Sequence, residues 1–558
     1  MKIAILALNS SYTHTCLSAR ILRCALLKHG FDTDIIELTI NEKGGVISII
    51  EKCVQQKYDV YCFSTYIWNR ELMFGCIQGI KEIYPDCITI AGGPELYDGD
   101  KEFFIQNGFC DYLIKGEGEQ ALPLLLKNIK DYPIHTVLDG GECDDFEQSD
   151  EPYLCNKYCL KNQDLSGKLI YYESSRGCPF SCSYCLSSRH CGQRRVRFKP
   201  SEKVISELLA LSHTQAKTIK LVDRTFNADV KRADVIFKAL IEHCEKTNST
   251  TTYHFEMCAD LITPETVEIL KKAPQGLFRF EIGVQSISKA VLKEINRNFD
   301  PVKTLEKIRI LKQNTNIPLH IDLICGLPHE TLQSISQAFD KVYPLASQLQ
   351  TGFLKLLPST DLRQNAICHG IVYLKNPPYT VLKTNTMSFE DINTMRQVDA
   401  ANDVLSNELY SNTRAYIMPR VVSPYDFFLK LSQNSEFFSL AGKRRYGFLL
   451  EFICDYFGDG SDRELLRSYL LFDFLLTNQG TPPKELYTLS KEQEYQKKRI
   501  LKDLFFSKNK NGEYTKNSQF EQLDFASSEL YNFEFSPQNT YILDRKHKIF
   551  KVLQKIVF

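Results

Sequence analysis

Three closely spaced cysteines constrain this chain more than any other feature. The stretch from Ser174 to Cys185 reads Ser-Ser-Arg-Gly-Cys-Pro-Phe-Ser-Cys-Ser-Tyr-Cys and follows an apolar run, Lys168 to Tyr172, that predicts a strand. Thiolates packed this closely are typical soft ligands for iron or zinc. A closed structural zinc site takes four ligands, whereas three thiolates on a four-iron cluster leave one iron open to a small molecule. The count of three therefore favours a cluster, with zinc as the alternative.

The spacing resembles the signature of the radical S-adenosylmethionine (SAM) superfamily, C-x-x-x-C-x-aromatic-C. Cys178, Cys182 and Cys185 match its cysteines. Tyr184 matches its aromatic residue. The resemblance implies a 4Fe-4S cluster whose open iron takes the amino and carboxylate groups of SAM. An electron from that cluster would cleave SAM to a 5′-deoxyadenosyl radical.

The remaining cysteines carry less information. Nineteen cysteines without a secretory leader indicate a reducing cytoplasm, where thiols are metal ligands or ordinary core residues. Cys191 follows the motif closely and is interpreted as a bystander. Cys155 and Cys159 form a second C-x-x-x-C, for which an auxiliary metal site is an alternative to plain thiols.

Composition narrows the class of protein. A chain of 558 residues should hold several domains. Its 43% hydrophobic and 24% charged residues are ordinary for globular proteins. Basic and acidic residues balance at 68 each, which argues against a broad nucleic-acid footprint. No apolar run is long enough to span a bilayer, so we expect a cytoplasmic protein without membrane contact.

Residues 1–137 alternate short apolar strands with amphipathic helices, such as Thr15 to His29 and Arg70 to Ile83. This alternation predicts a mostly parallel, doubly wound sheet of the flavodoxin or Rossmann type. Ligands of such sheets lie at the carboxyl ends of the strands. The expected strands are Lys2 to Leu8, Thr33 to Leu38, Asp59 to Ser64, Cys87 to Ala91 and Asp111 to Ile114.

The strand ends of this first module carry hydroxyls and a glycine pair, Ser64, Thr65, Gly92 and Gly93. They resemble the cobalamin-binding domain found ahead of many radical SAM domains. Ser64 matches the serine of its S-x-L motif, with Tyr66 in place of leucine, and the glycines match its later glycine pair. The D-x-H-x-x-G motif that supplies a histidine to cobalt is absent. A degenerate fold without cofactor is the alternative.

After a turn-rich linker, residues 138–167, a second strand and helix alternation occupies residues 168–386. Six such units fit the partial, TIM-like (β/α) barrel of the radical SAM core, with chemistry expected at the carboxyl ends of the strands. The expected strands are Leu169 to Ser174, Thr218 to Val222, Thr252 to Met257, Leu277 to Val284, Leu319 to Ile324 and Gly352 to Leu357.

Carboxylates and an amide stand in or just after these strands. A carboxylate in an apolar strand is costly unless it is paired or bound to ligand. By analogy with the radical SAM family, Asp223, Glu256, Glu281 and Gln285 would contact SAM, with Asp322 as a further candidate. For each of them alone, a structural salt bridge is the alternative.

From residue 387 to 558 the barrel pattern stops, and aromatic, helical stretches such as Arg445 to Tyr456 and Arg463 to Leu475 predict a mainly helical C-terminal domain. Lys508 to Lys516, which contains Asn511-Gly512, predicts a basic loop or a hairpin turn. This domain resembles an uncharacterised extension of cobalamin-linked radical SAM proteins.

The resemblance implies an enzyme that uses cobalamin as methyl carrier for radical methylation of an unactivated carbon or phosphorus atom. Its substrate would be a small molecule or peptide, and its electron donor a flavodoxin or ferredoxin. Radical cyclisation or rearrangement is an alternative, and so is a methylthiotransferase. The latter would need a second three-cysteine cluster, whereas the N-terminal cysteines stand singly. A non-enzymatic iron–sulfur or cobalamin sensor is the remaining alternative.

Overall fold

The computed structural model describes residues 1–96, 103–104, 107–154, 165–188, 196–458, 462–477, 480–488, 491–508, 514–516, 528–532, 539–544 and 549–554. Cys155, Cys159 and Cys191 lie outside these residues. Contacts divide the chain into two units, one of Met1–Ala338 with Leu345–Ile392 and one of Phe339–Pro344 with Asn393–Phe558. None of the described helices combines the length and apolarity that crossing a bilayer requires.

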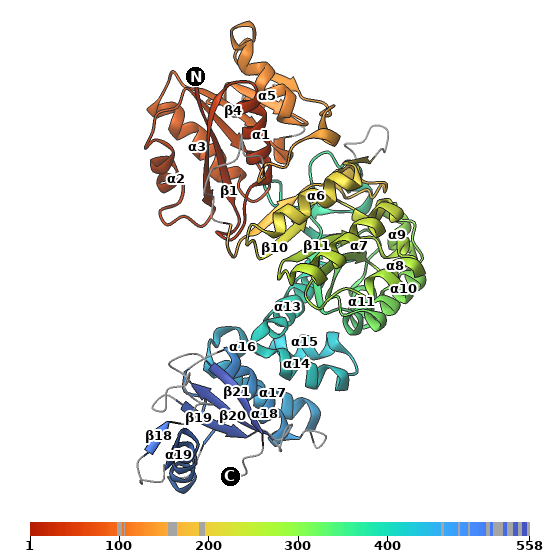
Figure 1. Cartoon of the computed structure of the whole chain (residues 1–558). Coiled ribbons are helices and arrows are strands. Elements are labelled where there is room, and N and C mark those ends of the chain that lie inside the picture. Colours follow the sequence, from red (N-terminus) through yellow and green to blue (C-terminus); the bar gives the residue numbers. More distant parts are fainter. Residues whose placement is uncertain are drawn as a thin grey trace. The chain divides into compact units, whose positions relative to one another are not determined.

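The first unit begins with a six-stranded, all-parallel sheet in the order β2-β1-β3-β4-β5-β6. Figure 1 shows it in red and orange with helices on both faces. Helices α2 (Gly45–Cys53) and α3 (Arg70–Ile83) cover one face, and α1 (Leu17–Lys28) and α5 (Gly118–Lys127) cover the other. The strands are β1 (Lys2–Asn9), β2 (Asp32–Thr39), β3 (Val60–Ser64), β4 (Ile88–Gly92), β5 (Tyr112–Lys115) and β6 (Thr136–Asp139).

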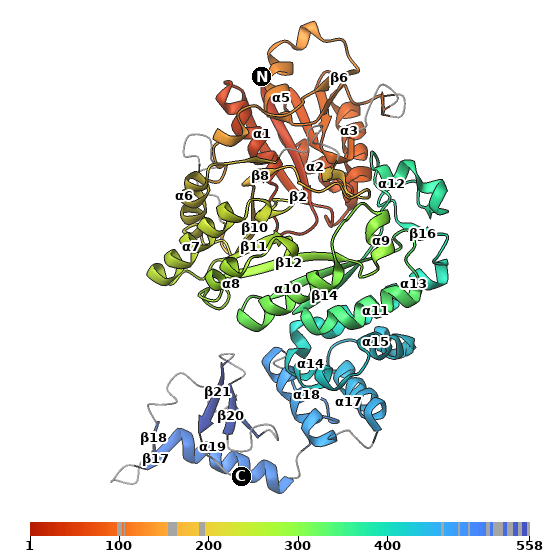
Figure 2. The same cartoon turned by 90° about the vertical axis from the view of Figure 1, so that its right-hand side faces the viewer.

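A second parallel sheet follows, in the order β14-β13-β12-β11-β10-β7. Because this order never closes on itself, the sheet is an open barrel, and its helices lie along the outside (Figure 2). Its strands are β7 (Leu169–Tyr172), β10 (Thr218–Leu221), β11 (Thr252–Met257), β12 (Phe278–Gln285), β13 (Leu319–Cys325) and β14 (Gln348–Phe353). Its helices are α6 (Ser201–Ser212), α7 (Val230–Thr247), α8 (Pro264–Leu270), α9 (Lys289–Glu294), α10 (Pro301–Asn314) and α11 (Leu332–Val342).

The two faces of the barrel sheet differ in polarity. On the helix side, five phenylalanines form one aromatic cluster, with ring centroids 4.4 to 6.2 Å apart (Phe226, Phe237, Phe255, Phe278 and Phe280). Each ring removed from water stabilises the fold by roughly 1.5–3 kcal/mol. On strands β10 to β13, the alternate residues that face the barrel interior include lysine, glutamate, aspartate and histidine. The interior is thus polar.

The second unit is helical and then forms short antiparallel strands. Asp473 is buried in it and accepts hydrogen bonds from the backbone and side chains of Asn412 and Thr413. Its helices are the greater part of α13 (Phe389–Ser406), α14 (Ser411–Ile417), α15 (Pro424–Gln433), α16 (Ser435–Ser439), α17 (Lys443–Phe457), α18 (Arg463–Thr477) and α19 (Lys491–Phe505). Its strands are β17 (Phe506–Lys508), β18 (Tyr514–Lys516), β19 (Ser528–Asn532), β20 (Asn539–Asp544) and β21 (Ile549–Gln554).

These observations confirm the predicted fold class: a doubly wound N-terminal sheet, a six-stranded partial barrel and a mainly helical C-terminal region. Strands β17 and β18 pair antiparallel, as expected for a hairpin, and the predicted turn Asn511-Gly512 lies outside the described residues. Several details differ. Strand β6 was assigned in part to the linker, and strand β14 begins four residues earlier than predicted. The strands that were not predicted are β8 (Ser175–Arg176), β9 (Arg197–Phe198), β15 (Val372–Tyr373), β16 (Val381–Lys383) and β19 to β21. The predicted domain boundaries remain predictions.

Candidate functional site

The cysteine loop begins directly after β7, at the carboxyl edge of the barrel sheet. Strand β8 (Ser175–Arg176) pairs antiparallel with β9 (Arg197–Phe198), and Gly177 then turns the chain with a φ of +94° that favours glycine. Cys182 is buried, whereas Cys178 and Cys185 are partly exposed. Tyr184 lies beside the Cys182 thiol, and burial raises the pKa of its hydroxyl. The predicted loop residues therefore lie together.

The segment that follows α9 holds the loop in place. The Ser183 amide donates to the Ile295 carbonyl oxygen at 3.0 Å. The side chain of Asn296 donates to both the carbonyl oxygen and the hydroxyl of Ser181. Because these bonds hold the loop on both sides of its second cysteine, Cys182, residues 295–296 fix its conformation.

Two polar side chains approach the sulfur atoms. Arg297 Nη1 lies 3.6 Å from Cys182 Sγ, and Thr225 Oγ1 lies 3.6 Å from Cys178 Sγ. A guanidinium and a hydroxyl are the kind of groups that stabilise sulfur ligands of an iron–sulfur cluster through hydrogen bonds. The loop residues thus fit a cluster.

The spread of the three sulfur atoms also fits a cluster better than one ion. Among the described residues, only Glu294, His329 and His369 bring three possible ligand atoms within 4.8 Å of one another. The three cysteine sulfur atoms are therefore spread more widely than that. With Zn–S bonds of about 2.3 Å, two thiolates on a tetrahedral zinc ion lie roughly 3.8 Å apart. A four-iron cluster is larger than a single ion, so its thiolate ligands must lie further apart.

Asp223 lies beneath the start of the loop. It is fully buried, and its carboxylate accepts hydrogen bonds from the Ser174 amide and from the hydroxyls of Ser174 and Ser175, at 3.0, 2.6 and 2.5 Å. The buried Arg232 donates to the same Ser174 hydroxyl at 2.9 Å. These contacts make Asp223 a support for the loop, and its predicted contact with SAM stays a prediction.

Gln285 ends strand β12 in an unusual conformation. Its φ is +69°, and the register shifts between Gly283 and Gln285. A Cβ atom on Gly283 would lie 2.1 Å from the Gln285 side-chain nitrogen, so a larger residue there would displace this side chain from its position. Gln285 Oε1 is buried and has no hydrogen-bond partner among the described residues. Since a buried polar atom is costly without a partner, this acceptor fits a polar ligand such as SAM.

Glu281 forms the centre of the polar barrel interior. Its carboxylate lies 2.8 Å from Lys220 Nζ on β10 and 3.1 Å from His254 Nε2 on β11. Burial favours the neutral acid, but these contacts with His254 and Lys220 prevail and lower the pKa of Glu281 to about 2. At neutral pH, Glu281 is therefore an anion with a fixed cationic partner.

Asp322, on the neighbouring strand β13, has the opposite character. Burial, together with the charges of Glu281 and Glu256, raises its pKa to about 8. Burial likewise raises the pKa of Glu256, and the His320 ring lies 3.5 Å from Asp322. At neutral pH, Asp322 is mostly protonated and can donate a hydrogen bond into the barrel.

Asp322→Asn should remove a pH dependence from the stability of this unit. The folded protein binds this proton more tightly than the unfolded chain, whose aspartate pKa is 3.8. The resulting stabilisation is complete below pH 3.8 and disappears as the pH rises through about 8. Between about pH 6 and 9 the wild-type protein should therefore lose up to roughly 2–3 kcal/mol that the variant does not lose.

The single tryptophan, Trp68, lies in the same unit, so its fluorescence in urea can follow this difference. Glu306→Gln, at an exposed surface pair, serves as control. Parallel pH profiles for the wild type and Asp322→Asn would disprove the assignment.

The strand ends of the N-terminal sheet provide the residues expected to hold cobalamin. Thr65 is fully buried, and its hydroxyl has no hydrogen-bond partner in the described part of the chain. The Ser64 hydroxyl lies 3.2 Å from that of Ser18. Gly93, with φ +115°, packs so tightly on Thr65 that a Cβ atom would lie 2.4 Å from its carbonyl oxygen. Gly92 packs against the backbone of Ile114. The unpartnered Thr65 hydroxyl fits a polar cofactor. Gly92 and Gly93, by contrast, are explained by close packing against neighbouring backbone, without any ligand.

Two aromatic residues extend this edge of the sheet. Tyr66 stacks on Trp68 with ring centroids 4.4 Å apart, and the Trp68 indole donates to the Leu8 carbonyl oxygen.

His14, in the first loop, has Nδ1 2.9 Å from the Tyr171 hydroxyl on β7. His14 therefore contacts the barrel through a hydrogen bond.

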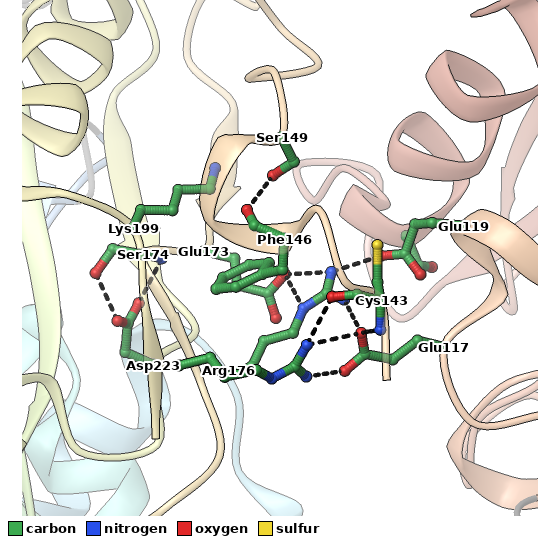
Figure 3. Close-up of polar contacts among 12 residues, drawn as sticks. Glu117, Glu119, Cys143, Phe146, Ser149, Glu173, Ser174, Arg176, Lys199 and Asp223 are labelled. Atoms are coloured by element: carbon green, nitrogen blue, oxygen red, sulfur yellow. Dashed lines mark hydrogen bonds and ion pairs between the residues drawn. The ribbon is translucent and has the colours of Figure 1, made fainter. Parts of the chain in front are cut away.

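An ion-pair network joins the cysteine loop to the N-terminal sheet. Figure 3 shows Arg176 between three carboxylates, Glu117 and Glu119 at the start of α5 and Glu173 after β7. The three N–O distances are 2.6, 2.6 and 2.9 Å, and the guanidinium lies over the ring of Phe146. Arg176 therefore connects the loop to the carboxyl edge of the first sheet.

Arg176→Gln is expected to destabilise this unit by about 2–3 kcal/mol, because it removes the half-buried cation that Glu119 and Glu173 share, whereas Glu117 keeps its ion pair with Arg197. Trp68 fluorescence in urea measures the change. Arg309→Gln, which breaks an exposed pair with Glu306, should change stability by less than about 1 kcal/mol. Equal effects of the two substitutions would contradict a linking role for Arg176.

The predicted site residues thus gather at two places. The cysteines, Tyr184, Asp223, Glu256, Glu281 and Gln285 lie in or at the edge of the barrel, and Ser64, Thr65, Gly92 and Gly93 lie at the carboxyl edge of the first sheet. Further residues of the site were not predicted: Lys220, His254, Arg297 and His320. Lys220, His254 and His320 could have been predicted from the sequence, because each is a lysine or histidine within an apolar strand. Arg297 offered none.

The cysteines of the N-terminal sheet are buried and belong to separate elements. They include Cys16, Cys53, Cys62, Cys76, Cys87 and Cys110. Burial raises the pKa of all six, to about 12 for Cys62 and Cys76, so they are neutral thiols packed in the core.

Comparison with known families assigns three regions. Residues 3–126 match the B12 binding domain, residues 172–342 match the radical SAM superfamily, and residues 368–546 match a protein family of unknown function, DUF4080. The first two matches cover the two parallel sheets. They confirm the 4Fe-4S cluster, SAM and cobalamin as the cofactors of these domains.

Curated relatives include two methyltransferases. The 2-(S-pantetheinyl)-carbapenam-3-carboxylate methyltransferase of Streptantibioticus cattleyicolor is 25% identical over 50% of this chain and 43% of its own. The cobalamin-dependent radical SAM methyltransferase TokK of Streptomyces tokunonensis is 24% identical over 54% of this chain and 48% of its own. The chain therefore spans less than half the length of either. A tRNA-2-methylthio-N(6)-dimethylallyladenosine synthase of Buchnera aphidicola is 23% identical over 62% of this chain and 75% of its own.

Solved structures share the fold at low identity. The cobalamin-dependent SAM radical enzyme OxsB, with aqua-cobalamin and SAM bound, has a TM-score of 0.57 and 15% identity over 88% of this chain and 82% of its own. The methyltransferase TsrM of Kitasatospora setae has a TM-score of 0.54 and 16% identity over 68% and 80%. The chain thus combines a B12-binding domain, a radical SAM domain and a C-terminal DUF4080 region.

Proposed function

We propose that this protein is a radical SAM enzyme that methylates an unactivated carbon or phosphorus atom and uses cobalamin as the methyl carrier. The observation that carries the proposal is the link made by Arg176, which joins the cysteine loop directly to the strand ends of the B12-binding domain. A substrate radical, formed when the SAM-derived radical abstracts hydrogen, would take a methyl group from cobalamin only if the two cofactors lie close together.

The residues of the barrel have distinct parts in this proposal. Cys178, Cys182 and Cys185 hold the cluster, and Arg297 and Thr225 contact two of the sulfur atoms. When bound, the cluster and SAM supply hydrogen abstraction, and cobalamin supplies a transferable methyl group. The protein supplies position and a site without bulk water.

The polar interior suits a substrate with its own hydrogen-bonding groups. Glu281 accepts as an anion, and protonated Asp322 donates. The substrate is therefore a polar small molecule or a peptide, and the electron comes from a protein such as a flavodoxin or ferredoxin. In the N-terminal sheet, the unpartnered Thr65 hydroxyl contacts cobalamin.

Methyl transfer is favoured over methylthiolation by the N-terminal cysteines. A methylthiotransferase would need a second cluster there, yet these six thiols are buried and lie on different elements. The balanced charge of the chain also gives no support to an RNA substrate.

The test uses anaerobically reconstituted protein with reductant and SAM that carries an isotope-labelled methyl group. We expect saturable binding of hydroxocobalamin in an absorbance titration, release of 5′-deoxyadenosine, and label in a substrate found by a mass-shift survey of metabolites and peptides. Absence of saturable binding would contradict the cobalamin assignment. Release of 5′-deoxyadenosine with an unlabelled, rearranged product would favour radical rearrangement.

A further inference from the structure

We propose that Glu294, His329 and His369 form a binding site for a divalent transition-metal ion such as Zn²⁺, separate from the iron–sulfur site. Their ligand atoms all lie within 4.8 Å of one another, the only such trio in the described part of the chain. The site goes beyond the proposed function, since none of the three residues belongs to the cysteine loop or to the barrel interior.

The distances within this trio suit a shared ion better than direct hydrogen bonds. His329 Nε2 and His369 Nε2 each lie 3.5 Å from a carboxylate oxygen of Glu294. Hydrogen bonds between nitrogen and oxygen are shorter, about 2.7–3.2 Å. Two ligands that each bind a tetrahedral zinc ion at about 2.0–2.1 Å lie roughly 3.3–3.4 Å apart. The two imidazole rings are nearly perpendicular, at 85°, so they converge on the carboxylate without stacking.

Three separate backbone elements bring these side chains together. Glu294 is the last residue of α9, His329 lies in the turn after β13, and His369 ends the short helix η8 (Ala366–His369). His329 has a φ of +64°, which costs a residue with a side chain roughly 1–2 kcal/mol. Such a conformation persists only where the surrounding structure enforces it, and here it directs the ring toward Glu294.

A cavity of about 280 Å³ adjoins the trio. Its lining consists of Ser183, Glu294, Leu362, Asn365, Cys368 and His369. Cys368 is an exposed thiol next to His369. Two histidines and a carboxylate, with a fourth position for water or a thiolate, are a common ligand set for zinc.

The ion would brace the cysteine loop. Ile295, directly after Glu294, accepts the amide hydrogen of Ser183, and Ser183 lies between two predicted cluster ligands. An ion at Glu294 therefore fixes the segment that holds the loop. The three residues are positioning residues in this respect, and none touches the reacting atoms.

The test measures zinc in the reconstituted holoprotein, with its cluster already in place. Titration with Zn²⁺ against a competing chelator, followed by metal analysis, should show one tightly bound equivalent. X-ray absorption at the zinc edge should show nitrogen and oxygen at about 2.0–2.1 Å with at most one sulfur at about 2.3 Å. His329→Ala, His369→Ala and Glu294→Gln should each weaken binding by more than about 100-fold, above the 10–100-fold loss typical of outer-shell partners.

A matched control is the double variant His213→Ala/His243→Ala, which removes another contacting histidine pair in the same unit and should leave zinc binding unchanged. Glu294→Gln preserves the shape of the side chain and therefore tests the site if an alanine variant does not fold. A first shell of three sulfurs would place the zinc at the cysteine loop and overturn the proposal. Zinc binding that persists in His329→Ala/His369→Ala would overturn it as well. Neither result would affect the proposed methyl transfer, which is measured separately.

Discussion

Cys182→Ala is expected to abolish reductive cleavage of SAM, with at least a 1,000-fold loss of 5′-deoxyadenosine formation, about 4 kcal/mol or more in the activation free energy. Cys182 is the buried member of the three cysteines, and Arg297 approaches its sulfur atom. A cluster that is bound by three thiolates has no spare ligand, so two remaining cysteines cannot hold it with its open iron. The measurement is iron and sulfide content together with 5′-deoxyadenosine release under anaerobic conditions.

Cys244→Ala is the matched control for this experiment. Cys244 belongs to helix α7 of the same domain and is also buried, and its thiol donates to the Ser249 carbonyl oxygen at 3.5 Å. Burial raises the pKa of its thiol, which therefore stays neutral. The control variant should retain both cluster and activity. Undiminished turnover in Cys182→Ala would remove the basis for assigning radical SAM chemistry to this loop.

Both parallel sheets could be predicted from the sequence because their strands are short apolar runs between amphipathic helices. The predicted helix Arg70 to Ile83 coincides with α3, and the predicted strand Thr252 to Met257 coincides with β11. In each case, the buried apolar residues recur with the period of the helix or strand, so the sequence pattern shows where the element begins and ends.

Strands β6 and β14 were harder to predict for different reasons. Strand β6 has only four residues at the edge of its sheet, and the acidic, glycine-rich sequence behind it is typical of a loop. Strand β14 contains two exposed glutamines, and the apolar run continues beyond it. The Leu354 amide still donates to Cys325 of β13. The Leu354 carbonyl oxygen, however, accepts from Val381 and the Leu356 amide donates to Tyr379, so the apolar run continues past the end of the barrel strand.

The site could be predicted where the chemistry lies in contiguous residues. Three cysteines within eight positions are such a case. Arg297 lies more than one hundred residues from the cysteine that it contacts, and only the packing of the β12 and α9 segments brings them together. Lys220 and Glu281 are a similar case. They lie on different strands, and only the folded barrel brings their side chains into contact.

Asp223→Ala is expected to destabilise the first unit by about 3–5 kcal/mol and to prevent cluster assembly. The carboxylate is fully buried and accepts three hydrogen bonds from Ser174 and Ser175. Alanine would leave those donors unsatisfied and would remove the negative charge that faces the buried Arg232. Because Ser174 and Ser175 lead directly into the cysteine loop, their release should also disorder the cluster ligands.

A matched control lies six residues further along. Asp229 caps helix α7 by accepting from the Arg232 amide at 3.0 Å and is exposed, so Asp229→Ala should cost only about 1 kcal/mol and keep the cluster. Trp68 fluorescence in urea and iron content measure the two effects separately.

If Asp223 contacts SAM, Asp223→Asn should keep the cluster and weaken only SAM binding. If Asp223 instead supports the loop, cluster content should fall with stability in Asp223→Ala, while SAM affinity per assembled cluster stays constant. A stable Asp223→Ala variant with a full complement of iron and sulfide would show that the loop does not depend on this carboxylate.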